Sequence, residues 1–219
     1  MSKVSLLCRG KSLGSIKSLP QVNECVIVNS FQNELKIKDI SEYVTQCKKV
    51  IHVCSLGAQF KPMISDEIYK NYNIQKIVLP YIEECCPPIP DFVRYIGVPI
   101  DKMLDINKED MVSTPRYKFT SPTAGMDALL YCVNDLQKKE VNIIGMDFYD
   151  GVGYLTNSHG ITKVNDGEAI SRAAGGGDTT DVMKLFFMNF VKKHDDVNFN
   201  IFTKSKFDEK IDNLNVILV

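Results

Sequence analysis

Short runs of β-branched and other apolar residues alternate with helical patterns along the first 80 positions. Four such runs predict strands, at residues 4–8, 25–28, 50–54 and 76–79. Apolar residues three or four positions apart predict a helix over residues 40–48, capped by Asp39 or Ser41, and a shorter helix over residues 64–72. Continuous apolar strands separated by helices are typical of a parallel sheet that is covered on both faces.

The alternation resumes after a proline-rich stretch. Residues 80–122 predict loops, a short strand near residues 92–98 and one helix near Asp101. Beyond them the pattern predicts helices at residues 124–136 and 181–194, and strands at residues 141–144, 199–202 and 215–219, the last at an edge. Residues 150–178, rich in Gly, Asn, Asp and Thr, predict a lid loop. We therefore expect one Rossmann-like α/β domain over residues 1–219, with a central, mostly parallel sheet and a glycine-rich lid.

Composition narrows the functional classes. The chain has 219 residues, 44% hydrophobic and 24% charged, as in an ordinary globular protein. The formal charge of −1 gives no reason to expect a nucleic-acid partner. The sequence has no apolar run of the roughly 18 residues that a transmembrane helix needs. Seven cysteines scattered through predicted strands and loops indicate reduced thiols and a cytoplasmic location. Because CxxC pairs are absent and the three histidines lie far apart, we expect no metal site.

Candidate chemistry lies where predicted strands end, because open parallel sheets bind ligands beyond the carboxyl ends of their strands. After the first strand, Gly10 permits close backbone approach and Ser12 is expected to cap the next helix, a geometry that suits a phosphate. This turn lacks the spacing of a Walker motif. Asn29 ends the second strand, where it would contact a ligand or simply cap the strand.

A third cluster follows the strand at residues 141–144. Asp147, Tyr149, Asp150 and Tyr154 lie together there, beside two glycines. Two tyrosine hydroxyls could donate to a leaving phosphate, a task often given to a metal ion. The alternative is that one ring belongs to the core and the other to the surface.

Two blocks in this order resemble a known family. Residues 6–13 (LLCRGKSL) and 26–30 (VIVNS) resemble the first conserved block of sialyltransferases, and residues 122–125 (PTAG) with 141–149 (VNIIGMDFY) resemble the second. The similarity is greatest to the bacterial CMP-sialic-acid-dependent enzymes of glycosyltransferase family forty-two, and more distant to eukaryotic family twenty-nine. It covers residues 4–31 and 120–154. It implies a GT-A-variant type of Rossmann-like fold.

The resemblance also implies residue roles. The CMP-sugar would be bound by residues of the first turn, the second strand end and the start of the helix at 124, namely Arg9, Gly10, Lys11, Ser12, Asn29, Thr123, Ala124 and Gly125. Backbone N–H groups of the last three would point toward the ligand. Tyr149 and Tyr154 would hold the departing phosphate without a metal, and Asp147 lies in the same catalytic block.

The chain departs from the family at three places. Arg9-Gly10-Lys11 replaces Asn-Gly-Pro, so two cations could bind phosphate directly or change which nucleotide is accepted. Val53 falls where the family has an asparagine. The slot of the catalytic histidine, a few residues before Thr180-Asp181, lies near Gly176.

A replacement base is therefore needed. His159 in the predicted lid is the first candidate, against the alternative of a solvated loop histidine. Asp178 and Asp181 follow, although Asp181 could instead cap the last helix. His52 and His194 are interpreted as structural.

Three functional hypotheses result. The first is a metal-independent, inverting glycosyltransferase that moves sialic acid or a related sugar from a CMP-sugar to a glycan acceptor, with no cofactor besides the donor. The second is a pterin diphosphokinase-like transferase in which Lys11 and the aspartates serve ATP and Mg²⁺. The third is a catalytically silent relative that binds a nucleotide sugar. The expected partners are a nucleotide-sugar donor and a glycan acceptor, while homo-oligomerisation and weak association with a membrane surface stay open.

Overall fold

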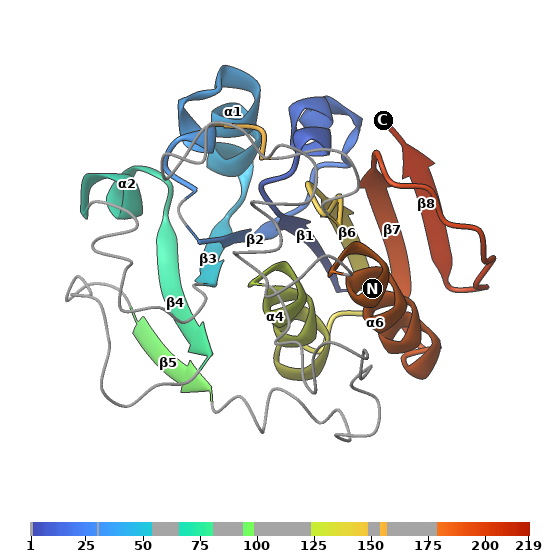
Figure 1. Cartoon of the computed structure of the whole chain (residues 1–219). Helices are drawn as coiled ribbons and strands as arrows, with labels where there is room; N and C mark the ends of the chain where they lie inside the picture. The colour runs from blue at the N-terminus through green and yellow to red at the C-terminus, as the bar shows by residue number, and fades with distance from the viewer. Residues whose placement is uncertain are drawn as a thin grey trace.

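The computed structural model describes residues 2–29, 31–53, 66–80, 94–98, 124–148, 154–156 and 179–219. They form an eight-stranded sheet whose pairings are all parallel, flanked by helices (Figure 1). The elements in chain order are β1 (Lys3–Leu7), the 3-10 helix η1 (Lys11–Ser18), β2 (Glu24–Val28), the 3-10 helix η2 (Glu34–Lys36), α1 (Lys38–Gln46), β3 (Lys49–Val53), α2 (Asp66–Asn71), β4 (Ile74–Pro80), β5 (Arg94–Val98), α4 (Ala124–Leu130), the π-helix η4 (Tyr131–Asp135), β6 (Glu140–Ile144), α6 (Thr179–Lys193), β7 (Asn198–Thr203) and β8 (Leu214–Leu218).

The strand order creates a topological switch point between β1 and β6. The sheet runs β5-β4-β3-β2-β1-β6-β7-β8, so the chain extends outward from β1 in one direction and then returns to extend in the other. Leu6 of β1 is paired with Val26 of β2 on one side and with Ile143 of β6 on the other. Connections on the two sides of such a point leave the sheet in opposite directions, which opens a crevice at the strand ends.

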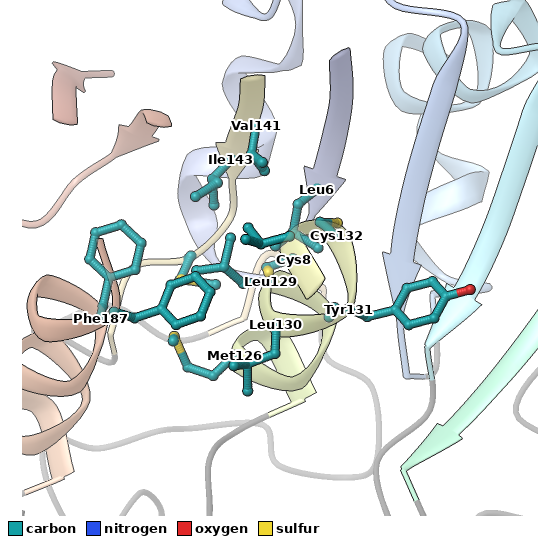
Figure 2. Packing of buried hydrophobic residues seen from close by; sticks show 14 of the residues in the cluster. Leu6, Cys8, Met126, Leu129, Leu130, Tyr131, Cys132, Val141, Ile143 and Phe187 are labelled. Atoms are coloured by element: carbon teal, nitrogen blue, oxygen red, sulfur yellow. The ribbon is translucent and has the colours of Figure 1, made fainter. Parts of the chain in front are cut away.

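Both faces of the sheet are buried. Neighbouring side chains of a strand point to opposite faces, so Leu6 belongs to one core and Leu7 to the other. The Leu6 core lies against α4 and α6, and Figure 2 shows Leu129 of α4 below Ile143 of β6, with Met126 and Phe187 in the same cluster. The Leu7 core lies against η1 and α1. Two covered faces explain why the strands read as continuous apolar runs.

The Rossmann-like α/β prediction is confirmed, and the expected strands and helices in the described ranges lie close to their predicted positions. Two capping predictions are wrong. Helix α1 follows Ile37 without a side-chain cap, because it begins before Asp39 and Ser41. Ser12 lies inside η1, whose first turn follows Gly10, and its hydroxyl is used elsewhere. The helix predicted from residue 124 continues as the π-helix η4.

Some expectations lie outside the described residues. These are the helix near Asp101 and most of the lid at residues 150–178, of which only residues 154–156 are described. The assignment of residues 1–219 to a single domain likewise stays a prediction.

Candidate functional site

A cavity opens at the carboxyl ends of β1, β2 and β6, on the switch point of the sheet. Helix α4 begins at its edge, and Met183 of α6 lies in its wall. The described residues of its wall are Cys8, Arg9, Gly10, Val28, Asn29, Ala124, Gly125, Met126, Gly145, Met146, Asp147, Phe148, Tyr154 and Met183. The cavity therefore occupies the position where this class of sheet binds ligands.

Two glycines allow the turns after β1 and β6 to touch. The Cys8 amide donates to Ile144 O and the Gly10 amide to Gly145 O, both at 2.8 Å. A β-carbon at Gly10 would lie 2.5 Å from Asp147 Oδ2, and one at Gly145 would lie 2.2 Å from the Cys8 carbonyl oxygen. Gly145 also has a φ of 77°, in the left-handed region that favours glycine. Larger residues at either position would force the two strand ends apart.

Asp147 joins three segments at the base of the cavity. Its carboxylate accepts hydrogen bonds from the Ser12 amide at 2.8 Å, from Thr203 Oγ1 at 3.0 Å and from the Lys204 amide at 3.0 Å. The residue is only 3% exposed. With both oxygens engaged by protein donors, Asp147 is a positioning residue for the turns after β1, β6 and β7.

Ser12 and Lys11 lie away from the cavity wall. Ser12 is fully buried, and its hydroxyl accepts a hydrogen bond of 2.9 Å from the Gly145 amide. The Ser12 hydroxyl therefore stabilises the turn after β6, which forms part of the cavity wall, without lining the cavity itself. Lys11 is exposed on the first turn of η1. Among the predicted cations of this turn, Arg9 is the one that lines the cavity.

Two residues of the wall have a left-handed backbone conformation. Asn29 and Phe148 have φ values of 51° and 50°, a conformation that asparagine tolerates and that strains a bulky residue such as phenylalanine. Asn29 is held by its amide, which donates to Val53 O at 2.9 Å, and by its carbonyl, which lies 2.6 Å from His52 Nε2. Phe148 is held by ring contacts with Phe187 and Phe207.

His52 is buried and supports Asn29. Its full burial lowers the pKa of the imidazole from 6.5 to about 4, since burial disfavours the charged form. The ring is therefore neutral near pH 7, and its Nε2–H can donate to the Asn29 carbonyl. This agrees with the structural role expected for His52.

The lowered pKa of His52 predicts a loss of stability in mild acid. The unfolded chain, with a histidine pKa near 6.5, binds a proton at a pH where the folded chain does not, because His52 in the folded chain is protonated only near pH 4. The free energy of unfolding should fall by about 2 kcal/mol between pH 7 and pH 5 because of this residue. Urea titrations at both pH values should show the free energy of unfolding of the native protein falling by about 2 kcal/mol relative to that of His52→Gln. Asp127, whose pKa is raised to about 7 by burial, acts with the opposite sign in both proteins and cancels. Equal pH slopes would contradict the account.

Arg9 forms the charged corner of the site. It is 5% exposed, its Nε donates to Glu34 Oε1 at 3.1 Å, and its guanidinium carbon lies 4.9 Å from the centre of the Tyr154 ring. Glu34 Oε1 also accepts a hydrogen bond of 2.5 Å from Thr156 Oγ1. The backbones of Gly10 and Tyr154 form a β-bridge. Residues 154–156 are thereby fastened to the end of β1.

The rest of the wall is largely apolar. It comprises Val28, Met126, Met146, Phe148, Met183 and the Cys8 thiol. Burial, and then the charge of Asp147, raise the pKa of Cys8 well above its usual range, so this thiol is no nucleophile at neutral pH. The wall is thus mainly apolar and includes three polar residues, Arg9, Asn29 and Tyr154. Such a wall suits a ligand that has a flat or hydrocarbon part and an anionic part.

Most residues predicted for the site meet at this cavity. Seven line it, namely Arg9, Gly10, Asn29, Ala124, Gly125, Asp147 and Tyr154. Lys11 and Ser12 do not. Thr123, Tyr149, His159 and Asp178 lie outside the described residues, and their roles stay predictions. Asp181 lies in α6, which begins two residues earlier.

The sequence did not single out Glu34, Phe148 or Met183 for the site. Glu34 sits in a polar segment that resembles any exposed loop, so nothing marks it as a fully buried counter-ion. Phe148 and Met183 follow ordinary core periodicity. The Asp-Phe-Tyr run that contains Phe148 offered the one usable signal.

In the described part of the chain, His, Cys, Asp and Glu side chains form no group of three or more that could hold a metal ion. Over the same residues, no helix has the length and apolarity to cross a membrane.

No known family model matches the chain, and no curated protein matches it either. Among solved structures, the fold is similar to that of the sialyltransferase CST-II in complex with a trisaccharide acceptor and CMP. The TM-score is 0.49 at 15% sequence identity, and the match covers 99% of this chain and 94% of that chain. Similarity at this level carries no information about the reaction or about the role of any residue.

Proposed function

We propose that this protein is a glycosyltransferase that transfers sialic acid or a related sugar from a CMP-sugar donor to a glycan acceptor, with inversion and without a metal. The observation that carries the proposal is the make-up of one cavity. Residues 8–10 and 28–29 belong to the first sialyltransferase-like block and residues 124–125 and 145–148 to the second, and all of them line the cavity. It lies at the switch point, where doubly wound sheets bind nucleotides.

In the proposed reaction the acceptor hydroxyl oxygen attacks the anomeric carbon of the donor. The bond from that carbon to the phosphate oxygen breaks, its electron pair stays with CMP, and the hydroxyl proton passes to a base. Tyr154 in the wall, with Tyr149, would donate to the phosphate as charge develops there. His159 is the proposed base, a role that contributes about a hundred- to ten-thousandfold in rate.

The chain's own residues would orient the donor. Val28, Met126 and Phe148 offer apolar contact to a base or sugar ring, and Asn29 a polar group at the end of β2. The backbone of Thr123, Ala124 and Gly125 would face the phosphate. The donor is a substrate, so the proposal needs no further cofactor. We place the reaction in the cytoplasm, with soluble or membrane-associated glycans as acceptors.

The kinase-like alternative finds less support at this site. It needs Lys11 and the strand-end aspartates to serve ATP and Mg²⁺. Lys11 is exposed outside the described cavity wall, and both Asp147 oxygens accept protein hydrogen bonds. The third hypothesis, a catalytically silent protein that binds a nucleotide sugar, would use the same cavity. It differs from the proposal only in that no sugar is transferred.

A thermal-shift panel with CMP, CDP, UDP, GDP and ATP, each with Mg²⁺ or EDTA, tests the proposal. CMP at about a hundred times its Kd should stabilise the fold by about 3 kcal/mol, a rise in Tm of about 5–10 °C for a domain of this size. The rise should be the same in EDTA. Stabilisation by ATP with Mg²⁺, and none by CMP, would overturn the proposal in favour of the kinase-like alternative.

A further inference from the structure

One buried cation in the cavity wall has unused hydrogen-bonding capacity. The Arg9 guanidinium has five N–H donors, and within the described part of the chain only its Nε–H has a hydrogen-bond partner, Glu34 Oε1. Its Nη2 is buried with none. A buried donor without an acceptor is costly, and more so when the group is charged. The residue is 95% removed from solvent, so water at the protein surface does not relieve that cost in full.

Arg9 is also held in place before any ligand arrives. The Glu34 carboxylate fixes its Nε, and the Tyr154 ring lies against its face at 4.9 Å. The Leu155 amide donates to the Arg9 carbonyl oxygen at 2.8 Å. A guanidinium that is already oriented loses little entropy when it binds an acceptor, which favours tight recognition of a planar or tetrahedral oxyanion.

Among the described residues of the cavity wall, no anion competes for the unused edge of that guanidinium. Asp147 is the other charged residue among the described wall residues, and both its oxygens accept hydrogen bonds from Ser12, Thr203 and Lys204. Glu34 neutralises the charge of Arg9 but engages it through Nε, which leaves the other edge of the guanidinium unused.

We propose that Arg9, held by Glu34 and Tyr154, binds an oxyanion of the ligand in this cavity and thereby determines its specificity. The proposal rests on the proposed function, because a CMP-sugar of the sialic acid class offers two such groups, the phosphate and the sugar carboxylate. The competing arrangement is a closed pair in which Nη2 turns to Glu34 Oε2, which is also buried without a partner.

Calorimetric titrations of CMP, cytidine, N-acetylneuraminate and inorganic phosphate separate these arrangements. The test variant is the double substitution Arg9→Gln/Glu34→Gln, which removes both charges of the pair and leaves the net charge unchanged. The matched control is Lys11→Gln, which removes a cation two residues away, outside the described wall. Cytidine reports binding that involves no anion.

We expect the Kd of CMP to rise about ten- to a hundredfold in the double variant, as the loss of a charge-assisted hydrogen bond implies. The Kd of cytidine should stay the same, and Lys11→Gln should change the Kd of CMP less than threefold. If N-acetylneuraminate loses affinity while CMP does not, the carboxylate is the bound oxyanion. Unchanged affinity for every anion, or equal losses for CMP and cytidine, would overturn the assignment and favour the closed pair.

The two proposals can fail separately. Suppose that the native protein binds phosphate but neither CMP nor cytidine, and that the double variant does not bind phosphate. The CMP-sugar function then fails and the anion site stands. If the native protein and the double variant bind CMP equally and also bind N-acetylneuraminate equally, the anion site fails and the CMP-sugar function stands. Should the double variant not fold, Arg9→Lys decides, because it retains a counter-charge for Glu34 but has no Nη2. The same tenfold or greater rise in the Kd of CMP is then expected, and its absence counts against Arg9.

Discussion

Replacing Gly145 with alanine is expected to lower the free energy of unfolding by about 3 kcal/mol or more. The new β-carbon would lie 2.2 Å from the Cys8 carbonyl oxygen and 3.2 Å from the Arg9 amide nitrogen, at a φ of 77°. Strain at a left-handed position costs about 1 kcal/mol, and overpacking typically adds 1–3 kcal/mol. Backbone atoms cannot step aside as a flexible side chain can, and here they belong to the join between β1 and β6. Thermal unfolding should show a Tm lower by about 10 °C.

Gly14→Ala is the matched control for that substitution. Gly14 lies in η1, and among the described residues its added β-carbon would meet Leu155 Cδ1 alone, at 3.4 Å. The stability of Gly14→Ala should therefore stay within about 1 kcal/mol of the native protein. Equal effects of the two glycine substitutions would show that the close approach of the strand ends is not what requires glycine at position 145.

Asp147→Ala is expected to cost about 3–5 kcal/mol. The substitution removes the acceptor of the Ser12 and Lys204 amides and of the Thr203 hydroxyl, at distances of 2.8–3.0 Å. A buried donor left without an acceptor costs about 1–3 kcal/mol. The Ser12 and part-buried Lys204 amides lose their acceptor, whereas the Thr203 hydroxyl also lies 3.1 Å from the Met146 carbonyl oxygen. Urea denaturation of the variant should give a midpoint well below that of the native protein.

Asp147→Asn and Asp195→Ala distinguish the cause of that loss. Asparagine retains one acceptor oxygen and loses the charge, so it should be intermediate in stability. Asp195 is exposed in the turn after α6, and its removal should change stability by less than about 0.5 kcal/mol. A stable Asp147→Ala variant that has lost ligand affinity or turnover would contradict the positioning role and indicate direct contact with substrate.

The fold could be predicted from the sequence because strands that are buried on both faces of a sheet can be recognised as apolar runs. Strand β2 is apolar at every position after Glu24, and the helices between the strands keep a regular apolar spacing. The parallel order then places strand ends such as Arg9, Asn29 and Asp147 at one edge. The meeting of two distant sequence blocks at one cavity was therefore foreseeable.

Local chemistry at the site was less predictable. Ser12 was expected to cap a helix and face a phosphate, but its hydroxyl bonds to the Gly145 amide across the β1–β6 join. Asp147 was predicted to lie in the catalytic block, and no pattern in the sequence indicated that its carboxylate also joins three turns. Both outcomes depend on partners far away in the sequence. The pairing of Arg9 with Glu34 depends on such a contact as well, and single-residue patterns carry no trace of it.

The most direct test of the central claim is turnover of CMP-N-acetylneuraminate in EDTA. The release of CMP is measured with the enzyme in excess over the donor. Tyr154→Phe is the informative variant, because it retains the ring against Arg9 and removes only the hydroxyl that would donate to the leaving phosphate. The account predicts metal-independent release by the native protein and a rate lower by about a hundredfold in Tyr154→Phe. Absence of release and of CMP binding would contradict the account, whereas CMP binding without release would identify a silent relative.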